Sequence, residues 1–191
     1  MELESLPAPG PGDDPDELFD RVDAADHVIG RVRRGEAHRN PELIHRSVQI
    51  LVFASDGRVL LQRRSAAKDL FPGFYCASAS GHVASGEDYT ATARRELREE
   101  LGIAPALAYL GKETVLSAEE TEITALFAAR SDGPFTFHPT ETAGGQLFTL
   151  DALRAARQRD TLPLTPAARV ALAALDRIDR SGMLSGLLAM L

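Results

Sequence analysis

The amino-acid sequence predicts an α+β fold, in which a mixed β-sheet carries one central helix and at least one C-terminal helix. Two observations lead to this prediction. Short runs rich in β-branched and aromatic residues recur between residues 18 and 150 and are separated by turn residues. Apolar residues recur with helical spacing in the segments 88–102 and 165–191. The sum of these elements is an α+β fold or an α/β sandwich.

The composition is that of an ordinary globular protein with one domain. The chain has 191 residues and a mass of 20.6 kDa, and 44% of its residues are hydrophobic and 26% charged. A chain of this length can bury a sizeable core. Residues 1–16 contain prolines, glycines and acids but little to bury, so we predict a disordered N-terminal tail before a single domain over residues 17–191.

The charge excludes some partners. The net charge is −7, and no basic block of five or more residues occurs, which argues against binding to duplex nucleic acid. A small anionic substrate remains compatible, because one bound divalent cation can reverse the local charge. No apolar run is long enough to span a membrane. The single cysteine, Cys76, and the lack of a signal-peptide pattern favour the cytoplasm, and both a monomer and a homodimer remain open.

The first half of the domain should contain two hairpins. Residues 17–44 are predicted as an N-terminal hairpin and loop, because apolar residues alternate on both sides of a polar centre. The stretch 34–46 reads as irregular, with Pro41 blocking a regular helix. Two further β-rich runs within residues 47–65 flank Asp56-Gly57, which is a strong signal for a hairpin turn.

The second half should contain strands followed by a helical segment. Residues 68–82 read as a loop that leads into a short strand. Residues 106–117 and 121–130 read as two more strands, and residues 132–150 as a long loop that enters another strand. The C-terminal segment 165–191 is rich in Ala and Leu with helical spacing.

Residues 81–103, with the sequence GHVASGEDYTATARRELREELGI, contain the central helix. Ser85 and Asp88 are placed as a cap and a first-turn acid, so the helix should begin near Asp88. Gly102 should end it as a C-terminal cap. Every fourth residue is apolar or aromatic and belongs to the expected buried stripe: Tyr89, Ala93, Leu97 and Leu101.

Three glutamates of this helix form a candidate cation site. Glu96, Glu99 and Glu100 are spaced i, i+3 and i+4, so they share a polar face. Like charges at this spacing destabilise a bare helix by roughly a few tenths of a kcal/mol per pair. Mg²⁺ or Mn²⁺ removes this cost, because hard cations prefer carboxylate oxygen. Taken alone, the stretch RELREE favours a solvent-facing helix whose arginines neutralise its acids.

The spacing of residues over the whole segment 81–103 favours a cation site over a solvent-facing helix. The segment matches the Nudix box at nine constrained positions, seven of which demand one particular residue: Gly81, Glu87, Arg95, Glu96, Leu97, Glu99, Glu100, Gly102 and Ile103. A chance match at a given start is on the order of one in a billion. The sequence therefore resembles the Nudix family over the 23 residues of the motif, and a compatible strand order extends the resemblance over roughly residues 45–155.

The resemblance implies an α/β/α sandwich of the Nudix type and a metal-dependent active site. In that family the box is a loop–helix–loop that holds a divalent metal against a diphosphate. Glu99 and Glu100 would be the principal metal ligands, and Glu96 would be a further ligand or the base that deprotonates the attacking water. Glu87 completes the candidate metal set and would pair with Arg95.

Four further residues are candidates for the same site. Gly81 would permit a close approach of the backbone to the substrate. Arg63 and Arg64 follow a strand, and at least one of them is expected to face phosphate, with ion pairing to a nearby acid as the alternative. Glu141 lies in the long loop, from which some Nudix hydrolases take their base, so it competes with Glu96 for that role.

A second group of residues is similar to the metal site of type I isopentenyl diphosphate isomerases, which use the Nudix fold to move a double bond. The group combines three imidazoles with two carboxylates: His38, His45, His82, Glu120 and Glu122. The resemblance covers roughly residues 18–130 and implies a possible second metal site.

Two departures disfavour isomerase activity. Ser80 stands at the position of the isomerase cysteine, and a serine hydroxyl is far less acidic than a thiol. Cys76 lies four residues earlier, which is about 13 Å along an extended chain. The box also keeps every glutamate that hydrolysis needs.

We therefore expect a Mg²⁺- or Mn²⁺-dependent hydrolase that cleaves a diphosphate linkage in a nucleoside di- or triphosphate or a similar small metabolite. The alternatives are an isomerase and, third, a non-catalytic nucleotide-binding module.

Overall fold

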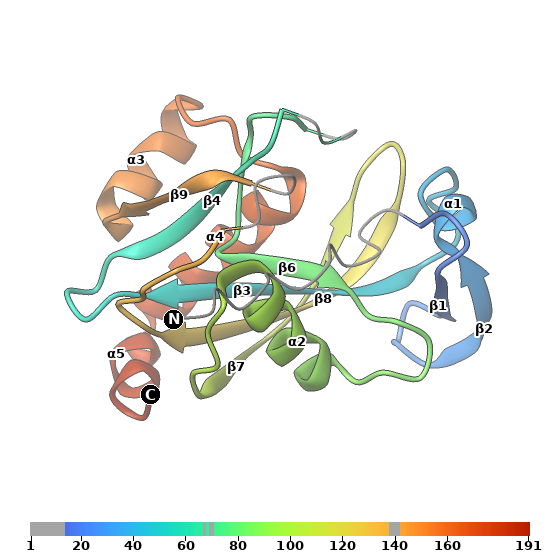
Figure 1. The fold of residues 1–191 in the computed structure, drawn as a ribbon, viewed down its shortest axis with the longest axis horizontal. Helices are drawn as coiled ribbons and strands as arrows, with labels where there is room; N and C mark the ends of the chain where they lie inside the picture. Colours follow the sequence, from blue (N-terminus) through green and yellow to red (C-terminus); the bar gives the residue numbers. More distant parts are fainter. Residues whose placement is uncertain (1–13, 67, 69–70, 138–141) are drawn as a thin grey trace, which may run out of the picture.

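Figure 1 shows the fold of the protein in a computed structural model, which describes residues 14–66, 68, 71–137 and 142–191. This described part of the chain contains nine strands and five helices. In chain order they are β1 (Leu18–Val22), β2 (Val28–Arg33), α1 (Arg34–Ala37), β3 (His45–Phe53), β4 (Val59–Arg64), β5 (Tyr75–Cys76), β6 (Ala79–His82), α2 (Tyr89–Leu101), β7 (Leu107–Leu116), β8 (Thr121–Arg130), β9 (Thr142–Phe148), α3 (Leu150–Arg159), α4 (Pro166–Arg180) and α5 (Met183–Ala189).

Seven strands form one mixed sheet, with the order β5-β4-β3-β8-β7 along its main path. β6 pairs with β3, and β9 pairs with β4. β3 and β8 run parallel, whereas the other pairs in this sheet are antiparallel. β1 and β2 form a separate two-stranded sheet. The mixed sheet with a central helix and C-terminal helices confirms the fold class that the sequence predicts.

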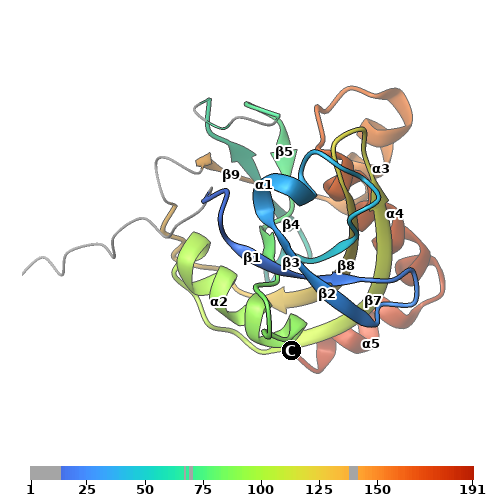
Figure 2. The same ribbon diagram turned by 90° about the vertical axis from the view of Figure 1, so that its right-hand side faces the viewer.

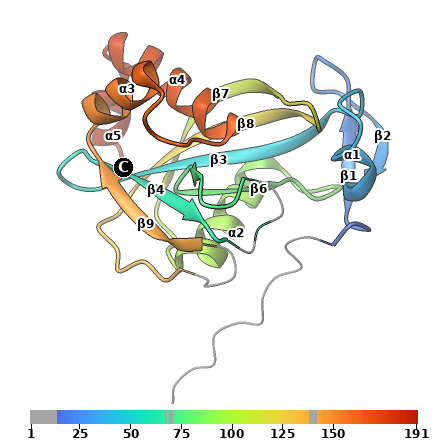
Figure 3. The same cartoon turned by 90° about the horizontal axis from the view of Figure 1, so that it is seen from above.

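The helices lie on both faces of the large sheet, as Figure 3 shows, with α2 on one side and α3, α4 and α5 on the other. Strand β3 serves both layers because its side chains alternate between the two faces. Val48 and Ile50 belong to the core under α2, whereas Leu51 and Phe53 belong to the core under the C-terminal helices. All four side chains are at most 1% exposed. The alternation of β3 therefore decides which of its polar residues can share a face.

The N-terminal hairpin, together with α1, lies at one end of the large sheet (Figures 1 and 2). Asp20 of β1 accepts a hydrogen bond from Ser85 Oγ at 2.7 Å. Asp26, in the turn between β1 and β2, accepts hydrogen bonds from Arg46 Nε at 2.6 Å and from the Tyr89 hydroxyl at 3.1 Å. These charged contacts hold the hairpin against the start of α2 and against β3.

Helix α2 begins and ends where the sequence predicts. The Asp88 side chain accepts hydrogen bonds from the backbone nitrogens of Thr90 and Ala91 at 2.8 and 2.9 Å, as an N-cap does. Gly102 takes a left-handed conformation with φ of 68° and ends the helix. The roles expected for Ser85 and Asp88 are wrong in detail: the Ser85 hydroxyl donates to Asp20 of the hairpin, and Asp88 is the N-cap rather than a first-turn acid.

Three other segments differ from the expectation. The stretch 34–46 contains the short helix α1, which ends before Pro41 and so is not blocked by it. Helix α3 was not predicted; the Thr149 hydroxyl caps it by accepting from Ala152 N at 3.2 Å. The C-terminal segment is two helices, because Gly182 adopts a φ of 79° between α4 and α5. Among the described residues, no helix combines the length and the apolar character needed to cross a membrane.

Candidate functional site

Strand β6 and helix α2 are in direct contact through Gly81 and Glu96. A Cβ atom at position 81 would lie 1.9 Å from Glu96 Oε1, so the carboxylate occupies the space that any side chain would need. Glu96 is 8% exposed, unlike an ordinary solvent-facing helical glutamate. The sequence placed Glu96, Glu99 and Glu100 on one polar face, but the side chain of Glu99 is 52% exposed and only Glu96 is buried.

Arg95 neutralises three carboxylates of this segment at once. Its Nη1 atom lies 2.7 Å from Glu96 Oε1 and 3.1 Å from Glu99 Oε2. Its Nη2 atom lies 3.2 Å from Glu87 Oε2 and donates to the backbone oxygen of His82 at 3.3 Å. Burial acts to lower the pKa of Arg95, but the hydrogen bonds to Glu87 and the charge of Glu96 raise it overall. The guanidinium therefore stays charged and ties the loop to the helix.

The acids of α2 differ in their environments. Burial raises the pKa of Glu96 to about 7, with the charge of Arg95 opposing and that of Glu99 adding to the shift. A carboxyl group with such a pKa can take up and release a proton near neutral pH, as a general base must. Glu100 accepts a hydrogen bond at 2.7 Å from the amide of Gln62, which is itself 3% exposed. Gln62 thus orients Glu100 from strand β4.

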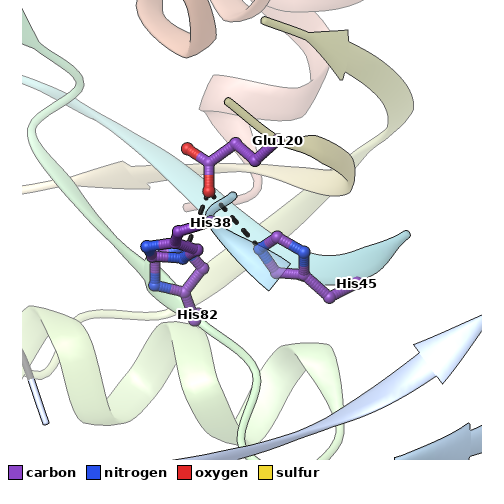
Figure 4. A group of neighbouring side chains, drawn as sticks. All are labelled: His38, His45, His82 and Glu120. Carbon is purple, nitrogen blue, oxygen red and sulfur yellow. Dashed lines mark ion pairs between the residues drawn. The ribbon is translucent and has the colours of Figure 1, made fainter. Parts of the chain in front are cut away.

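A second cluster lies beside this segment, as Figure 4 shows. One ligand atom from each of four residues lies within 4.8 Å of the other three: His38, His45, His82 and Glu120. Glu120 Oε2 is 3.1 Å from His38 Nε2 and 3.7 Å from His45 Nε2. Glu122 also reaches the cluster, with its Oε1 atom 3.3 Å from His82 Nε2. The structure therefore brings together all five residues of the predicted second site.

The sheet register assembles this cluster from distant parts of the chain. His45 begins β3 and is the cross-strand partner of Glu122 on β8. His82 ends β6, which pairs with β3 on its other side. His38 follows α1, and Glu120 precedes β8 by one residue. The segment after α1 and the large sheet thus both contribute imidazoles.

The donor atoms of the cluster fit a divalent cation. Three of these donor atoms are buried and, among the described residues, make no hydrogen bond, so they face only one another: His38 Nε2, His45 Nε2 and Glu120 Oε2. Burial lowers the pKa of His38 to about 3 and that of His45 to about 4, with the charge of His82 adding to both shifts. Both imidazoles are therefore neutral at pH 7, which is the form that binds metal. Three imidazoles and a carboxylate are a donor set that transition metals favour.

Two residues at this cluster were missed by the sequence reasoning. The ring of Phe19 stacks on His45 and His82, with centroids 5.1 and 4.9 Å apart, and is fully buried. Arg34 Nη1 lies 3.3 Å from His82 Nδ1 and 3.4 Å from Glu17. Neither residue belongs to a motif, and only the packing of the hairpin against β3 brings them here.

Strand β6 separates the two groups of side chains. Gly81 and His82 are consecutive, so their side-chain directions point to opposite faces of the strand. Glu96 packs against Gly81 on one face, and the imidazole of His82 joins the cluster on the other. Arg95, which donates to the His82 carbonyl, links the two groups.

The remaining predicted residues lie at the edges of this site or outside the description. Arg63 is exposed and donates from Nε to Gly73 O at 3.2 Å. Arg64 lies close enough to Glu120 for its charge to act on that carboxyl: burial and the charge of Glu122 raise the pKa of Glu120 to about 8, and the charges of Arg34 and Arg64 oppose the rise. Glu141 is outside the described residues, so its role as a competing base stays a prediction.

Comparison with known proteins identifies the family of the chain. The model of the NUDIX domain matches residues 43–168. The chain is 38% identical over 152 residues to an uncharacterized Nudix hydrolase of Yersinia pestis, which covers 73% of this chain and 83% of the relative. A crystal structure from Deinococcus radiodurans shares 31% identity with a TM-score of 0.68 and covers 78% of this chain and 93% of that one.

An isopentenyl-diphosphate Delta-isomerase of Nocardia farcinica is 43% identical over 90 residues, which is 47% of this chain and 51% of the relative. The chain thus spans about half the length of that isomerase. The matched segment has 90 residues, against 152 residues for the Yersinia relative. Since the NUDIX domain covers well over half of the chain, the chain belongs to the Nudix family.

Proposed function

We propose that this protein is a divalent-metal-dependent hydrolase that cleaves a diphosphate linkage in a nucleoside di- or triphosphate or a similar small metabolite. The packing of the Glu96 carboxylate against Gly81 carries the proposal, because it fixes one buried acid beside two more accessible ones. The family of the chain and the names of its hydrolase relatives support the same activity.

The acidic residues of helix α2 would have different roles in the reaction. Glu99 and Glu100 would hold Mg²⁺ or Mn²⁺, which when bound screens the phosphate charge and acidifies water. Glu96 would accept a proton at its carboxylate, since its raised pKa of about 7 suits a base at neutral pH. Arg95 holds Glu87 and Glu96 in place through hydrogen bonds of 3.2 and 2.7 Å. Gln62 keeps Glu100 oriented from the sheet.

The histidine cluster is proposed as a second metal site. Its three imidazoles are softer ligands than carboxylates, so Mn²⁺ or another transition metal fits it better than Mg²⁺. Arg34 lies 3.3 Å from Nδ1 of His82 and 3.4 Å from Glu17, and would add a positive charge beside the cluster where an anionic substrate binds. Because β6 separates the two sites, a diphosphate that reaches both would bind at the His82 end of this strand.

An isomerase is the second candidate, because the His/Glu cluster and the Nocardia relative favour it. The acid that such a reaction needs is missing from its expected place, where Ser80 stands. Cys76 does not replace it: burial raises the pKa of its thiol to about 12, and Sγ donates to the Gln62 carbonyl at 3.7 Å. The thiol thus donates its hydrogen bond within the sheet and is a poor acid.

A screen of diphosphate compounds with Mg²⁺ or Mn²⁺, scored by product, tests the proposal. Hydrolysis of at least one compound is expected, and Glu99→Gln or Glu100→Gln should lower turnover by at least about a hundredfold without unfolding the protein. Glu113→Gln is the matched control, because Glu113 lies on β7 in an ion pair with Arg177, away from α2. Full activity of the double variant would contradict the assignment.

The same screen separates the alternatives. With isopentenyl diphosphate, an allylic product would indicate the isomerase, whereas released phosphate would indicate the hydrolase. Metal-dependent thermal stabilisation by a nucleotide without any product would indicate a non-catalytic binding module.

A further inference from the structure

Helices α3 and α4 contact each other through charged side chains. Both lie on the face of the large sheet opposite α2, as Figure 3 shows. Leu153 of α3 is buried in the core under the C-terminal helices. The side of α3 that contacts α4 carries arginines instead: Arg154 Nε lies 2.9 Å from Asp176 Oδ1, and Arg157 Nη1 donates to Leu172 O at 3.1 Å. Surface helices usually pack through an apolar stripe, so this polar contact has to be explained.

A cleft of about 310 Å³ lies between the two helices. It is lined by four guanidinium groups, one amide and one carboxylate: Arg154, Arg157, Gln158, Arg169, Arg180 and Asp176. The three lining residues of α3 are spaced i, i+3 and i+4, so they share one face of that helix. On α4, Arg169 and Arg180 lie eleven residues apart, which is about 16 Å along the helix axis. The cleft is therefore elongated and has arginines at both ends.

The charge of this region differs from that of the rest of the chain. Residues 150–191 contain six arginines and four aspartates but no lysine or glutamate, although the net charge of the chain is −7. Three of the four aspartates contact the same arginine, Arg154: Asp151, Asp176 and Asp179. Arg157 shares Asp176 with Arg154, and its other acceptor is a neutral carbonyl. The positive charge of the cleft is therefore incompletely balanced away from Arg154.

Two lining side chains have donors without an acceptor. Neither Arg180 nor Gln158 makes a side-chain hydrogen bond or an ion pair with any residue that the structure describes. Arg169 donates from Nη2 to Asp160 at 2.6 Å, but the Asp160 side chain is 75% exposed, so water screens this pair. A guanidinium has five N–H donors, so Arg169 also keeps donors for a ligand. The contact between the helices accounts for Arg154 and Arg157 but not for Arg180 and Gln158.

We propose that the cleft between α3 and α4 binds a phosphoanhydride chain, either free as an oligophosphate or as the triphosphate of a nucleotide. Guanidinium groups match phosphate oxygens with paired hydrogen bonds. Arginines placed along an elongated cleft suit a ligand whose negative charges follow one another in a row. The site lies on the other face of the sheet from the acids of α2, and the inference does not depend on the proposed hydrolysis.

Calorimetry on the metal-free protein, at constant ionic strength and with a chelator present, tests the proposal. The chelator removes the cation through which the glutamates of α2 would hold a phosphate. Affinity should rise with chain length, and tripolyphosphate should bind at least about tenfold more tightly than orthophosphate, which reaches only one end of the cleft. Equal affinity for orthophosphate and tripolyphosphate, or no binding of either, would overturn the proposal.

Variants with the same change in net charge locate the binding. Arg180→Gln and Arg169→Gln should each weaken the binding of tripolyphosphate by at least about fivefold, because each removes charged donors from one end of the cleft. Arg159→Gln is the matched control: Arg159 is an exposed residue of α3 that does not line the cleft, so its loss should change affinity by less than about twofold. Equal effects of all three variants would mean that only the net charge matters, and would overturn the proposal.

Thermal unfolding separates binding from helix packing. Without an anion, Arg180→Gln should leave Tm unchanged or raise it, because Arg180 has no ion pair with a described residue to lose. Arg154→Gln is the comparison, and its Tm should fall because contacts with three aspartates are lost. Tripolyphosphate should raise the Tm of the wild type and of Arg159→Gln more than that of Arg180→Gln. A lower Tm of Arg180→Gln without an anion, together with unchanged affinity, would assign Arg180 to helix stability alone and overturn the proposal.

Titration with ATP under the same conditions identifies the source of the chain. Equal affinities for ATP and tripolyphosphate would mean that the cleft recognises the phosphate chain itself. At least about tenfold tighter binding of ATP would mean that the nucleoside is also bound, and both results support the proposal. Since the metal is absent from these titrations, their outcome is independent of whether the protein hydrolyses a diphosphate in the metal-supplemented screen.

Discussion

The carboxylate of Glu96 occupies the space beside Gly81 where a side chain on β6 would otherwise lie, with Oε1 1.9 Å from the position of a Cβ atom. The two residues are fifteen positions apart in the sequence, and only the packing of α2 on β6 brings them together. The Nudix glycine is thus explained here by its contact with a catalytic candidate.

Gly81→Ala should therefore impair catalysis more than folding. The added methyl group displaces the end of a flexible side chain, so Tm should change by only a few degrees, whereas a misplaced base lowers turnover by about a hundredfold or more. Gly30→Ala is the matched control, because nothing lies within 4 Å of a Cβ at that position. Circular dichroism melts and hydrolysis rates measure the two effects, and an unchanged rate for Gly81→Ala would contradict the role of Glu96.

Arg95→Lys should destabilise the protein when no divalent metal is present. A lysine cannot bridge Glu87, Glu96 and Glu99 at once, so their mutual repulsion is left incompletely balanced. The loss is about 1–2 kcal/mol for this partly exposed group, which lowers Tm by roughly 2–8 °C. Mg²⁺ should restore more stability to this variant than to the wild type. Arg98→Lys, at an exposed position of the same helix, should behave like the wild type in both measurements.

The sequence contained most of the information about helix α2, because caps and box spacing are local. Asp88 and Gly102 mark the ends of the helix in both the prediction and the structure. The turn at Asp56-Gly57 was equally accessible, since a hairpin depends on two adjacent residues.

The burial of the site residues could not be read from the sequence in the same way. Phe19 and Arg34 acquire their contacts with the histidine cluster through hairpin packing, which joins residues far apart in the chain. Helix α3 follows the expected strand, β9, after a single residue, and it was missed because Thr149 was not recognised as its N-cap.

Metal binding at the histidine cluster should release a proton near neutral pH. The pKa values of His38 and His45 are lowered to about 3 and 4, so these ligands are already neutral, whereas the raised pKa of Glu120, about 8, keeps that carboxyl protonated. Affinity for Mn²⁺ should therefore rise between pH 6.5 and 8, by up to about tenfold per pH unit, and then level off. Calorimetry in buffers of different ionisation enthalpy counts the proton. Glu120→Gln should remove it, and release that persists in this variant would contradict the assignment.

The same pKa values predict how the metal-free protein responds to pH. The folded state keeps a proton on Glu120 that the unfolded state releases above about pH 4.5, so this contribution to stability is full below pH 4.5 and is lost as the pH rises through 8. His38 and His45 act in the opposite sense, because the unfolded state protonates them below about pH 6.5. Between pH 6.5 and 8 the histidines no longer contribute, whereas the raised pKa values of Glu120 and of Glu96 both lower the stability as the pH rises. The free energy of unfolding, measured in urea with a chelator, should therefore fall by on the order of 1 kcal/mol over this range, and added Mn²⁺ should reverse the trend.

Phe19→Leu should weaken metal binding at the histidine cluster selectively. The Phe19 ring stacks on His45 with an angle of 12° between the planes and also contacts His38 and His82, so it fixes the orientation of all three imidazoles. A leucine fills much of the same volume but offers no flat surface, and the imidazoles should then become less well oriented for a cation. Val32→Ala is the matched control, because Val32 shares the small core of Phe19 and its truncation destabilises the hairpin by a similar mechanism. With Co²⁺ as a spectroscopic probe, Phe19→Leu should lower affinity by about tenfold or more and alter the ligand-field spectrum, whereas Val32→Ala should lower Tm and leave the spectrum unchanged. Equal effects of both variants on Co²⁺ binding would mean that Phe19 acts only through the stability of the hairpin.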